Sequence, residues 1–233
     1  MAVQPWTSVR GDLDRGPPMI KPTKPVKATL PELTRHDGAE LERDGDYDSL
    51  EFRGLDLSGQ DASGARFLDC ELADCVLDDG RYRGAQFIDC ELTDLRSTGL
   101  DLARASWREV VVHNGRFGAF TATESAMVRV RIRGGKFDYV NLRSAVLTDV
   151  SFEDCRIEEV DLWDAKLQDV KFTGCRIERL NLTAASLEEV DLSQAEIHFL
   201  DGIADLAGAV ISSAQLTDLA PLFAAHLGVR VTP

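Results

Sequence analysis

Large apolar residues recur at every fifth position along most of this chain. In residues 161–182, DLWDAKLQDVKFTGCRIERLNL, they are Leu162, Leu167, Phe172, Ile177 and Leu182. A helix would place successive members of this series about 140° apart around its axis. A strand would point them alternately to opposite faces, because five is an odd number. Neither element gives one apolar side, so the chain must change direction once every five residues.

The series runs without a break from Phe52 to Ile197. Of its 30 positions, 27 hold Leu, Phe, Ile, Val, Met, Trp or Tyr, and none is charged. A second uncharged column, mostly of small residues, lies two positions earlier, from Leu50 to Ala195. Because 28% of all residues are charged, two such columns are not chance. A short unit that cannot bury its own apolar residues must stack on its neighbours, so the pattern predicts a solenoid.

Units such as ARFLD, AKLQD and CRIER resemble the pentapeptide-repeat family, whose pattern is a small residue, a polar residue, a central Leu or Phe and two polar residues. The resemblance covers residues 50–199. It implies an all-β fold, a right-handed quadrilateral β-helix with four pentapeptides per coil, hence about 20 residues per turn and roughly seven and a half coils. Steps of one coil then predict three stacked pairs: Phe152 on Phe172, Ile157 on Ile177, and Leu162 on Leu182.

The composition divides the chain into three segments, 1–46, 47–200 and 201–233. Six of the eight prolines lie within residues 1–31, and none lies between Glu32 and Ala220. Stacked coils use backbone N–H groups that proline lacks, which explains this exclusion. Residues 1–46 are therefore predicted to be a largely disordered or extended arm. Residues 47–200 form the predicted solenoid.

Residues 201–233 leave the five-residue frame and are predicted to form a short helical cap. Ser212 and Gln215 make a capping box, and Pro221 either kinks the helix or starts a second one. The apolar residues at helical spacing are Leu216, Leu219, Phe223 and Leu227. Such a helix can cover the last coil as a lid. It can also be a dimer contact, because quinolone-resistance members of the resembled family pair through a C-terminal helix.

The five cysteines all belong to the small inward column: Cys70, Cys75, Cys90, Cys155 and Cys175. Their position predicts buried, reduced thiols, with Cys70 beside Cys90 and Cys155 beside Cys175. Their odd number argues against a disulfide framework. The sequence shows neither a secretory signal nor a membrane-spanning run, so the expected compartment is the cytoplasm.

No catalytic, cofactor or metal motif stands out. The chain has no phosphate-binding loop, dinucleotide fingerprint, nucleophile elbow or HExxH sequence. None of the four histidines has a triad partner at a recognisable spacing. We therefore expect a protein that is not an enzyme, that needs no cofactor and that acts through its surface.

The charge pattern gives that surface two distinct rows. The net charge is −14, which disfavours direct contact with nucleic acid or membranes. One row, taken every 20 residues and here called the acidic edge, contains Asp69, Asp89, Glu109, Asp149, Asp169 and Glu189, with Arg129 between the third and fourth. It is expected to have no partner in its own column. A second row holds Arg96, Arg116, Lys136, Arg156 and Arg176. Because Asp138, Glu158 and Glu178 follow the last three, it is expected to neutralise itself.

A row of acids one coil apart resembles a phosphate backbone, whose charges repeat about every 3.4 Å along one strand. The resemblance to quinolone-resistance pentapeptide proteins implies a DNA mimic that binds DNA gyrase or a related topoisomerase and modulates quinolone or toxin sensitivity. The Pro-rich arm and the absence of a loop insertion between coils depart from that group. The alternative is a general protein-interaction scaffold with another partner, in which outward acids keep the rod soluble.

Overall fold

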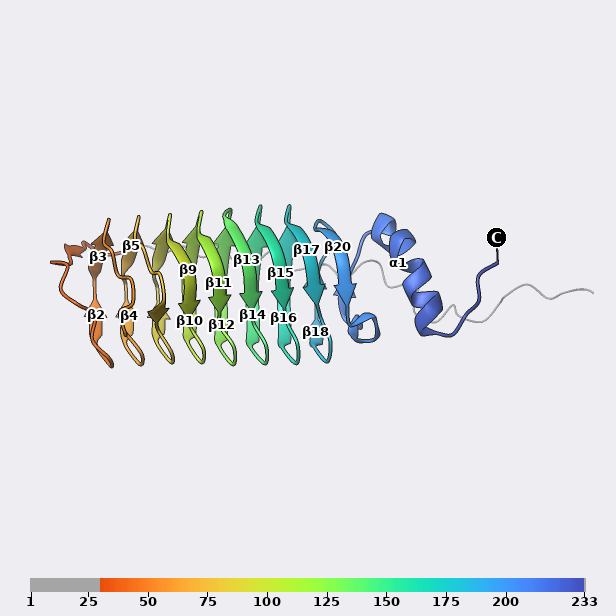
Figure 1. Ribbon diagram of the computed structural model, residues 1–233, viewed down its shortest axis with the longest axis horizontal. Helices are drawn as coiled ribbons and strands as arrows, with labels where there is room; N and C mark the ends of the chain where they lie inside the picture. Colours follow the sequence, from red (N-terminus) through yellow and green to blue (C-terminus); the bar gives the residue numbers. More distant parts are fainter. Residues whose placement is uncertain (1–29, 233) are drawn as a thin grey trace, which may run out of the picture.

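The computed structural model describes residues 30–232, which form a rod of stacked coils ending in one helix (Figure 1). The strands pair in parallel, and almost every pair joins residues 20 apart, such as Phe152 with Phe172 and Ile157 with Ile177. The solenoid makes about nine turns. The fold class predicted from the five-residue period is confirmed, and the rod is longer than seven and a half coils.

The strands form two parallel sheets that share the same coils. The larger sheet contains β1 (Thr34–Arg35), β2 (Asp46–Asp48), β3 (Leu50–Arg53), β4 (Arg66–Leu68), β5 (Glu71–Ala73), β7 (Gln86–Ile88), β8 (Glu91–Thr93), β10 (Ser106–His113), β12 (Ala126–Arg133), β14 (Val146–Glu153), β16 (Lys166–Thr173), β18 (Ser186–Glu188), β19 (Val190–Asp191) and β21 (Ala209–Val210). The smaller sheet contains β6 (Gly80–Arg81), β9 (Arg96–Asp101), β11 (Arg116–Thr121), β13 (Lys136–Asn141), β15 (Arg156–Asp161), β17 (Arg176–Asn181) and β20 (Glu196–Asp201). The short helix η1 spans Ile203–Asp205, and α1 spans Ser213–His226.

The core is a continuous column of the side chains that recur every fifth residue. Phe152 and Phe172 stack with their ring centroids 4.8 Å apart and their planes only 4° from parallel. On another side of the coil, Phe67 and Phe87 stack at 5.0 Å. Both pairs lie one coil apart. Side chains of successive coils therefore meet like with like, which is why one repeated pattern fills the whole rod.

The corners of the coil explain why the direction changes every five residues. The second residue after most central side chains has a positive φ, near 55° at Asp69, Asp94 and Asp154. This left-handed conformation is strained for most residues and is tolerated best by Gly, Asn and Asp. The positive φ at the corners therefore favours Asp at these positions. This conformational preference is distinct from any role of the acids in binding.

Part of the predicted N-terminal arm packs on the solenoid. β1 pairs in parallel with β3, joining Thr34 to Leu50 at a separation of 16 residues rather than 20. Leu41 is buried, and its N–H donates to the Gln60 side chain at 2.8 Å. The boundary predicted at residue 47 therefore does not separate the described residues 30–46 from the first coil. Residues 1–29 of the arm lie outside the described residues.

The prediction of buried, reduced cysteines is confirmed: all five are free thiols in the core. The pKa of Cys90 is raised by its hydrogen bond with Cys70 and by burial, so these two thiols are neighbours one coil apart. Cys155 and Cys175 interact in the same way. Cys is used here as a small apolar residue that fits beneath the larger side chains.

Candidate functional site

The acidic edge follows one corner of the larger sheet. Asp69 and Asp89 lie between short strands, at the turn from β4 to β5 and from β7 to β8, whereas Asp149 and Asp169 lie within β14 and β16. The six acids stand in one row with Arg129, because these seven residues follow one another at intervals of one coil and adjacent parallel strands lie about 4.8 Å apart. The side chains are half-buried rather than fully exposed.

Arg129 divides this edge into two acidic runs. Its guanidinium group forms an ion pair with the Glu109 carboxylate, so the expectation that the edge has no partner in its own column is wrong. The first run holds Asp69 and Asp89, and the second holds Asp149, Asp169 and Glu189. Arg131, which lies close by on β12, also acts on Asp149. The edge is therefore acidic at both ends and partly neutralised at its centre.

The acids of each run repel one another. Burial raises the pKa of the Asp89 carboxyl, and the charges of Asp69 and Glu109 raise it further. Burial also raises the pKa of Asp149; Arg131 opposes this shift and Asp169 adds to it. A carboxyl whose pKa is higher in the folded chain than in the unfolded chain lowers stability when it is ionised. That loss is recovered as the pH falls through the folded-state pKa, so the charged edge opposes folding at neutral pH.

Helix α1 lies against the last coil, and its predicted capping box is present. The Gln215 N–H donates to Ser212 Oγ at 3.2 Å, and the Ser212 N–H donates to Gln215 Oε1 at 2.8 Å. Gln215 Nε2 also donates to the carbonyl oxygens of Leu192 and Ala195, at 2.8 and 2.9 Å. One side chain thus starts the helix and satisfies two carbonyl groups at the end of the solenoid. Pro221 lies inside a single helix.

The four apolar residues predicted for this helix do not share one environment. Leu219 faces the last coil, and Phe223 is half-buried. Leu216 and Leu227 point outward and are 53% and 73% exposed. Leu222, which the sequence analysis did not single out, lines the same cavity as Leu219 but is 46% exposed. The helix therefore covers the end of the rod with one side and leaves apolar side chains on the other.

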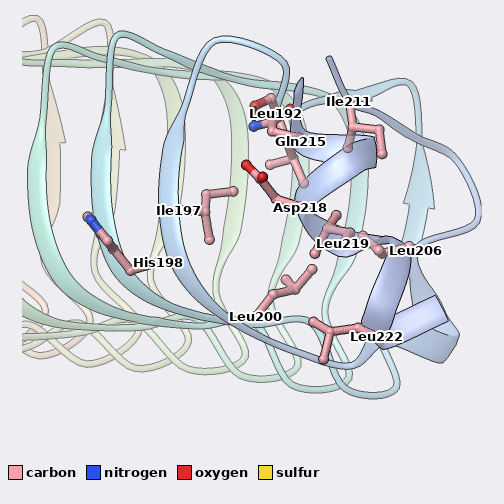
Figure 2. Close-up of a pocket in the computed structure, with 10 residues that line it drawn as sticks. All are labelled: Leu192, Ile197, His198, Leu200, Leu206, Ile211, Gln215, Asp218, Leu219 and Leu222. Carbon is pink, nitrogen blue, oxygen red and sulfur yellow. Dashed lines mark hydrogen bonds between the residues drawn. The ribbon is translucent and has the colours of Figure 1, made fainter. Parts of the chain in front are cut away.

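A cavity of about 140 Å³ separates α1 from the last coil (Figure 2). It is lined by Leu192, Ile197, His198, Leu200, Leu206, Ile211, Gln215, Asp218, Leu219 and Leu222. Most of these side chains are aliphatic, and Figure 2 shows the Asp218 carboxylate near Ile197. The periodic pattern could not predict this cavity, because it depends on how closely a non-repeating helix packs on the final coil.

Two kinds of feature, metal-binding clusters and membrane-spanning helices, are absent from the described part of the chain. Within residues 30–232, no three His, Cys, Asp or Glu residues are placed to hold a metal ion together. No helix in the same range has the length and hydropathy needed to cross a bilayer. The surfaces that remain for function are the acidic edge, the row of basic residues and the exposed side of α1.

Residues 125–200 match the family model described as pentapeptide repeat region. This part of the solenoid is a pentapeptide repeat region. No curated protein sequence matches the chain. Among solved structures, a trypsin-treated form of QnrB1, a plasmid-mediated fluoroquinolone resistance protein, has 16% identity and a TM-score of 0.30, covering 85% of this chain and 96% of its own. HetL, a pentapeptide-repeat protein involved in heterocyst differentiation regulation in the cyanobacterium Nostoc, has 15% identity and a TM-score of 0.29, covering 76% and 93%.

The match to the pentapeptide-repeat model agrees with the geometry of the five-residue units. Each contributes one side of a coil, with the small residue at its first position and the central Leu or Phe pointing inward, as Cys155 and Ile157 do. The polar positions point outward on every side. What distinguishes this solenoid is therefore the pattern of charge on its surface.

Proposed function

We propose that this pentapeptide-repeat protein is a cytoplasmic, non-enzymatic binding protein that presents its acidic edge to a DNA-binding groove, with DNA gyrase as the partner. The observation that carries the proposal is the row of carboxylates repeated once per coil. Charges about 4.8 Å apart along a straight rod are comparable in spacing with the phosphates of one DNA strand, about 3.4 Å apart. Such a rod would compete with DNA without binding DNA itself, and would alter sensitivity to quinolones or toxins that act on the gyrase–DNA complex.

The electrostatics of the edge support a role in binding. Solubility alone would be served by acids spread evenly over the four corners, whereas here six acids stand in one corner row. Burial raises the pKa of Asp89 and Asp149, and the neighbouring acids of the row raise it further. A basic groove would remove this repulsion, because it places cations beside both acidic runs. Association would then be fast at low salt and would weaken as salt rises, since exposed charges are screened over about 8–10 Å at physiological ionic strength.

The test compares two variants with the same change of charge. The edge variant is D69N/D89N/D149N/D169N, and the control is D74N/D79N/D94N/D154N, whose four residues also occupy corners with φ of 54–56°. We expect the wild type and the control to inhibit supercoiling by purified gyrase and the edge variant to lose this inhibition. The edge variant should unfold at the same or a higher temperature than the wild type, because repulsion is relieved. A wild type without effect on gyrase at micromolar excess contradicts the proposal.

A second candidate is a general protein-interaction scaffold, and the ion pair between Arg129 and Glu109 favours it. A cation in the middle of the row has no counterpart in a phosphate backbone. A scaffold of this kind would bind another partner, and pull-down experiments with the edge variant and its control would show whether the same edge is used. Partners lost only from the edge variant, together with unaffected gyrase, would support this candidate.

We also propose that the chain forms a homodimer through α1. Leu216 and Leu227 are exposed on the side of the helix that faces away from the last coil, and Val229 and Val231 continue this apolar surface. Exposed aliphatic groups of this kind are buried favourably at about 25 cal/mol per Å². Sedimentation velocity should show a dimer for the wild type and a monomer for L216E/L227E. A wild-type monomer at micromolar concentration would be incompatible with this pairing.

A further inference from the structure

A row of five cations runs along the smaller sheet. Arg96, Arg116, Lys136, Arg156 and Arg176 occupy the first positions of β9, β11, β13, β15 and β17, which lie side by side in Figure 1. Strand pairing joins each to the next, and all five are exposed. Neighbouring positive charges are therefore only about one strand spacing apart, roughly 4.8 Å. We call this set the basic row.

Only part of the basic row is neutralised, contrary to the expectation from the sequence. Lys136 Nζ lies 2.9 Å from an Asp138 carboxylate oxygen, and Arg176 lies 3.6 Å from Glu196. The acid that follows Lys136 after two residues is replaced by Thr98 and Gly118 in the two preceding coils. Among residues 30–232, no acid forms an ion pair with Arg96 or Arg116. Two adjacent guanidinium groups thus lack a counterion in a chain whose net charge is −14.

The surface beside these two arginines is hollow. An open depression of about 630 Å³ is lined by Arg96, Arg116 and Lys136 on one side and by Thr98 and Gly118 on the other. No side chain covers the floor of the depression at Gly118. A side chain would not fit there, because a Cβ atom on Gly118 would collide with the backbone carbonyl oxygen of Thr98. The backbone of a ligand can therefore come close to this sheet, at the point where the unpaired cations stand.

We propose that this depression binds an acidic segment of a partner protein, with one carboxylate on Arg96 and a second on Arg116. A guanidinium group binds a carboxylate through two parallel N–H···O hydrogen bonds, which are stronger than bonds between neutral groups. Two such groups about one strand spacing apart fit a pair of nearby carboxylates rather than a single ion. Lys136 adds positive charge at the edge of the depression, although its ammonium group already forms an ion pair with Asp138.

The charges around the depression favour a short acidic segment over a nucleic acid. Asp78 and Asp138 lie at its two ends, so a long polyanion would meet negative charge on either side of the basic row. The net charge of −14 would repel such a polymer at a distance. A segment of a few residues can place its carboxylates on the two arginines and leave the depression before it reaches these acids.

This proposal does not depend on the proposed function of the acidic edge. The basic row belongs to the smaller sheet, whereas the acidic edge follows a corner of the larger sheet. A substitution in one row leaves the charges of the other unchanged. Loss of gyrase inhibition and loss of acidic-segment binding are therefore separate results.

The test measures binding of a fluorescein-labelled Glu/Asp hexapeptide by fluorescence anisotropy at low salt. The variant R96Q/R116Q removes the two adjacent unpaired arginines that line the depression, and the control R66Q/R104Q removes two arginines that are paired with Asp46 and Glu124. We expect the wild type to bind, R96Q/R116Q to bind at least about tenfold more weakly, and the control to remain within about twofold. T98D, which supplies the missing acid beside Arg96, should also weaken binding, while circular dichroism confirms that the solenoid is intact.

Several results would overturn the proposal. They are the absence of peptide binding by the wild type, equal losses in R96Q/R116Q and R66Q/R104Q, or an unchanged affinity in T98D. Inorganic phosphate and a single-stranded oligonucleotide serve as competing anions in the same assay. Tighter binding of either than of the hexapeptide would show that the depression recognises phosphate and not an acidic protein segment.

Discussion

Replacing Leu95 with alanine is expected to lower the free energy of unfolding by about 2–5 kcal/mol. Leu95 is 2% exposed and stands in the column that otherwise holds small residues. Beside it, Ser97 occupies a central position that is filled elsewhere mainly by Leu, Phe or Ile. The leucine supplies the volume that the serine lacks. Because strands of neighbouring coils hold the walls of this site, they cannot close over the space left by a smaller side chain.

Chemical denaturation of L95A and of V146A, a control at an exposed valine on β14, measures this effect. The control should change stability by less than about 0.5 kcal/mol. A second variant, L95A/S97L, returns volume to the same site and should recover part of the loss. The Ser97 hydroxyl donates to the Leu77 carbonyl at 2.8 Å, but that carbonyl also accepts from the Gly80 N–H and so keeps a partner. A loss below about 1 kcal/mol in L95A would refute the compensation between these positions.

Replacing Gly135 with alanine is expected to destabilise the protein by roughly 2–5 kcal/mol. Its φ of +97° is one that residues with a side chain rarely adopt, and an added Cβ would overlap the backbone of Gly115 in the preceding coil. The strain of the backbone and the overpacking act together, and neither can be relieved by moving a flexible side chain.

The neighbouring residue provides a matched control. Gly134 has a φ of +65°, and the residues at the same corner one coil before and after are Asn114 and Asp154, both with φ of 54°. G134N should therefore change the unfolding temperature little, although it lies next to Gly135. Thermal unfolding of G135A and G134N compares the two directly. Equal effects would mean that the close approach to Gly115 is not what requires glycine at position 135.

Most of the solenoid could be predicted because its rule is local and repeated. Each group of five residues places one large and one small side chain inward, which predicted the burial of Cys70. The stack of Phe152 on Phe172 needed in addition the 20-residue coil that the family resemblance implies. The capping box of Ser212 and Gln215 was equally predictable, since it depends on two residues three positions apart. Geometry that depends on residues a few positions apart can be predicted from the sequence alone.

The sequence predicted which residues stand in the acidic edge and the basic row. It did not predict which of their charges are neutralised by ion pairs. Residues 20 apart must stack, yet which side chains pair depends on how long side chains cross between coils. Arg129 reaches Glu109 one coil away, and Arg83 reaches Asp101 at a separation of 18 residues. Within residues 30–232, Arg96 and Arg116 form no ion pair, although Asp78 and Asp138 line the same depression. Such contacts depend on distances in space that the five-residue frame does not contain.

The sequence by itself therefore determined the coil, its inward columns and the rows in which outward residues stand, because the same local geometry recurs in every unit of five. Tertiary structure alone decided the two ends. β1 joins β3 out of the 20-residue register, and α1 turns Leu219 toward the last coil while leaving Leu216 exposed. At each end of the rod no further coil covers the core. The packing there depends on which side chains can cover the exposed apolar surface.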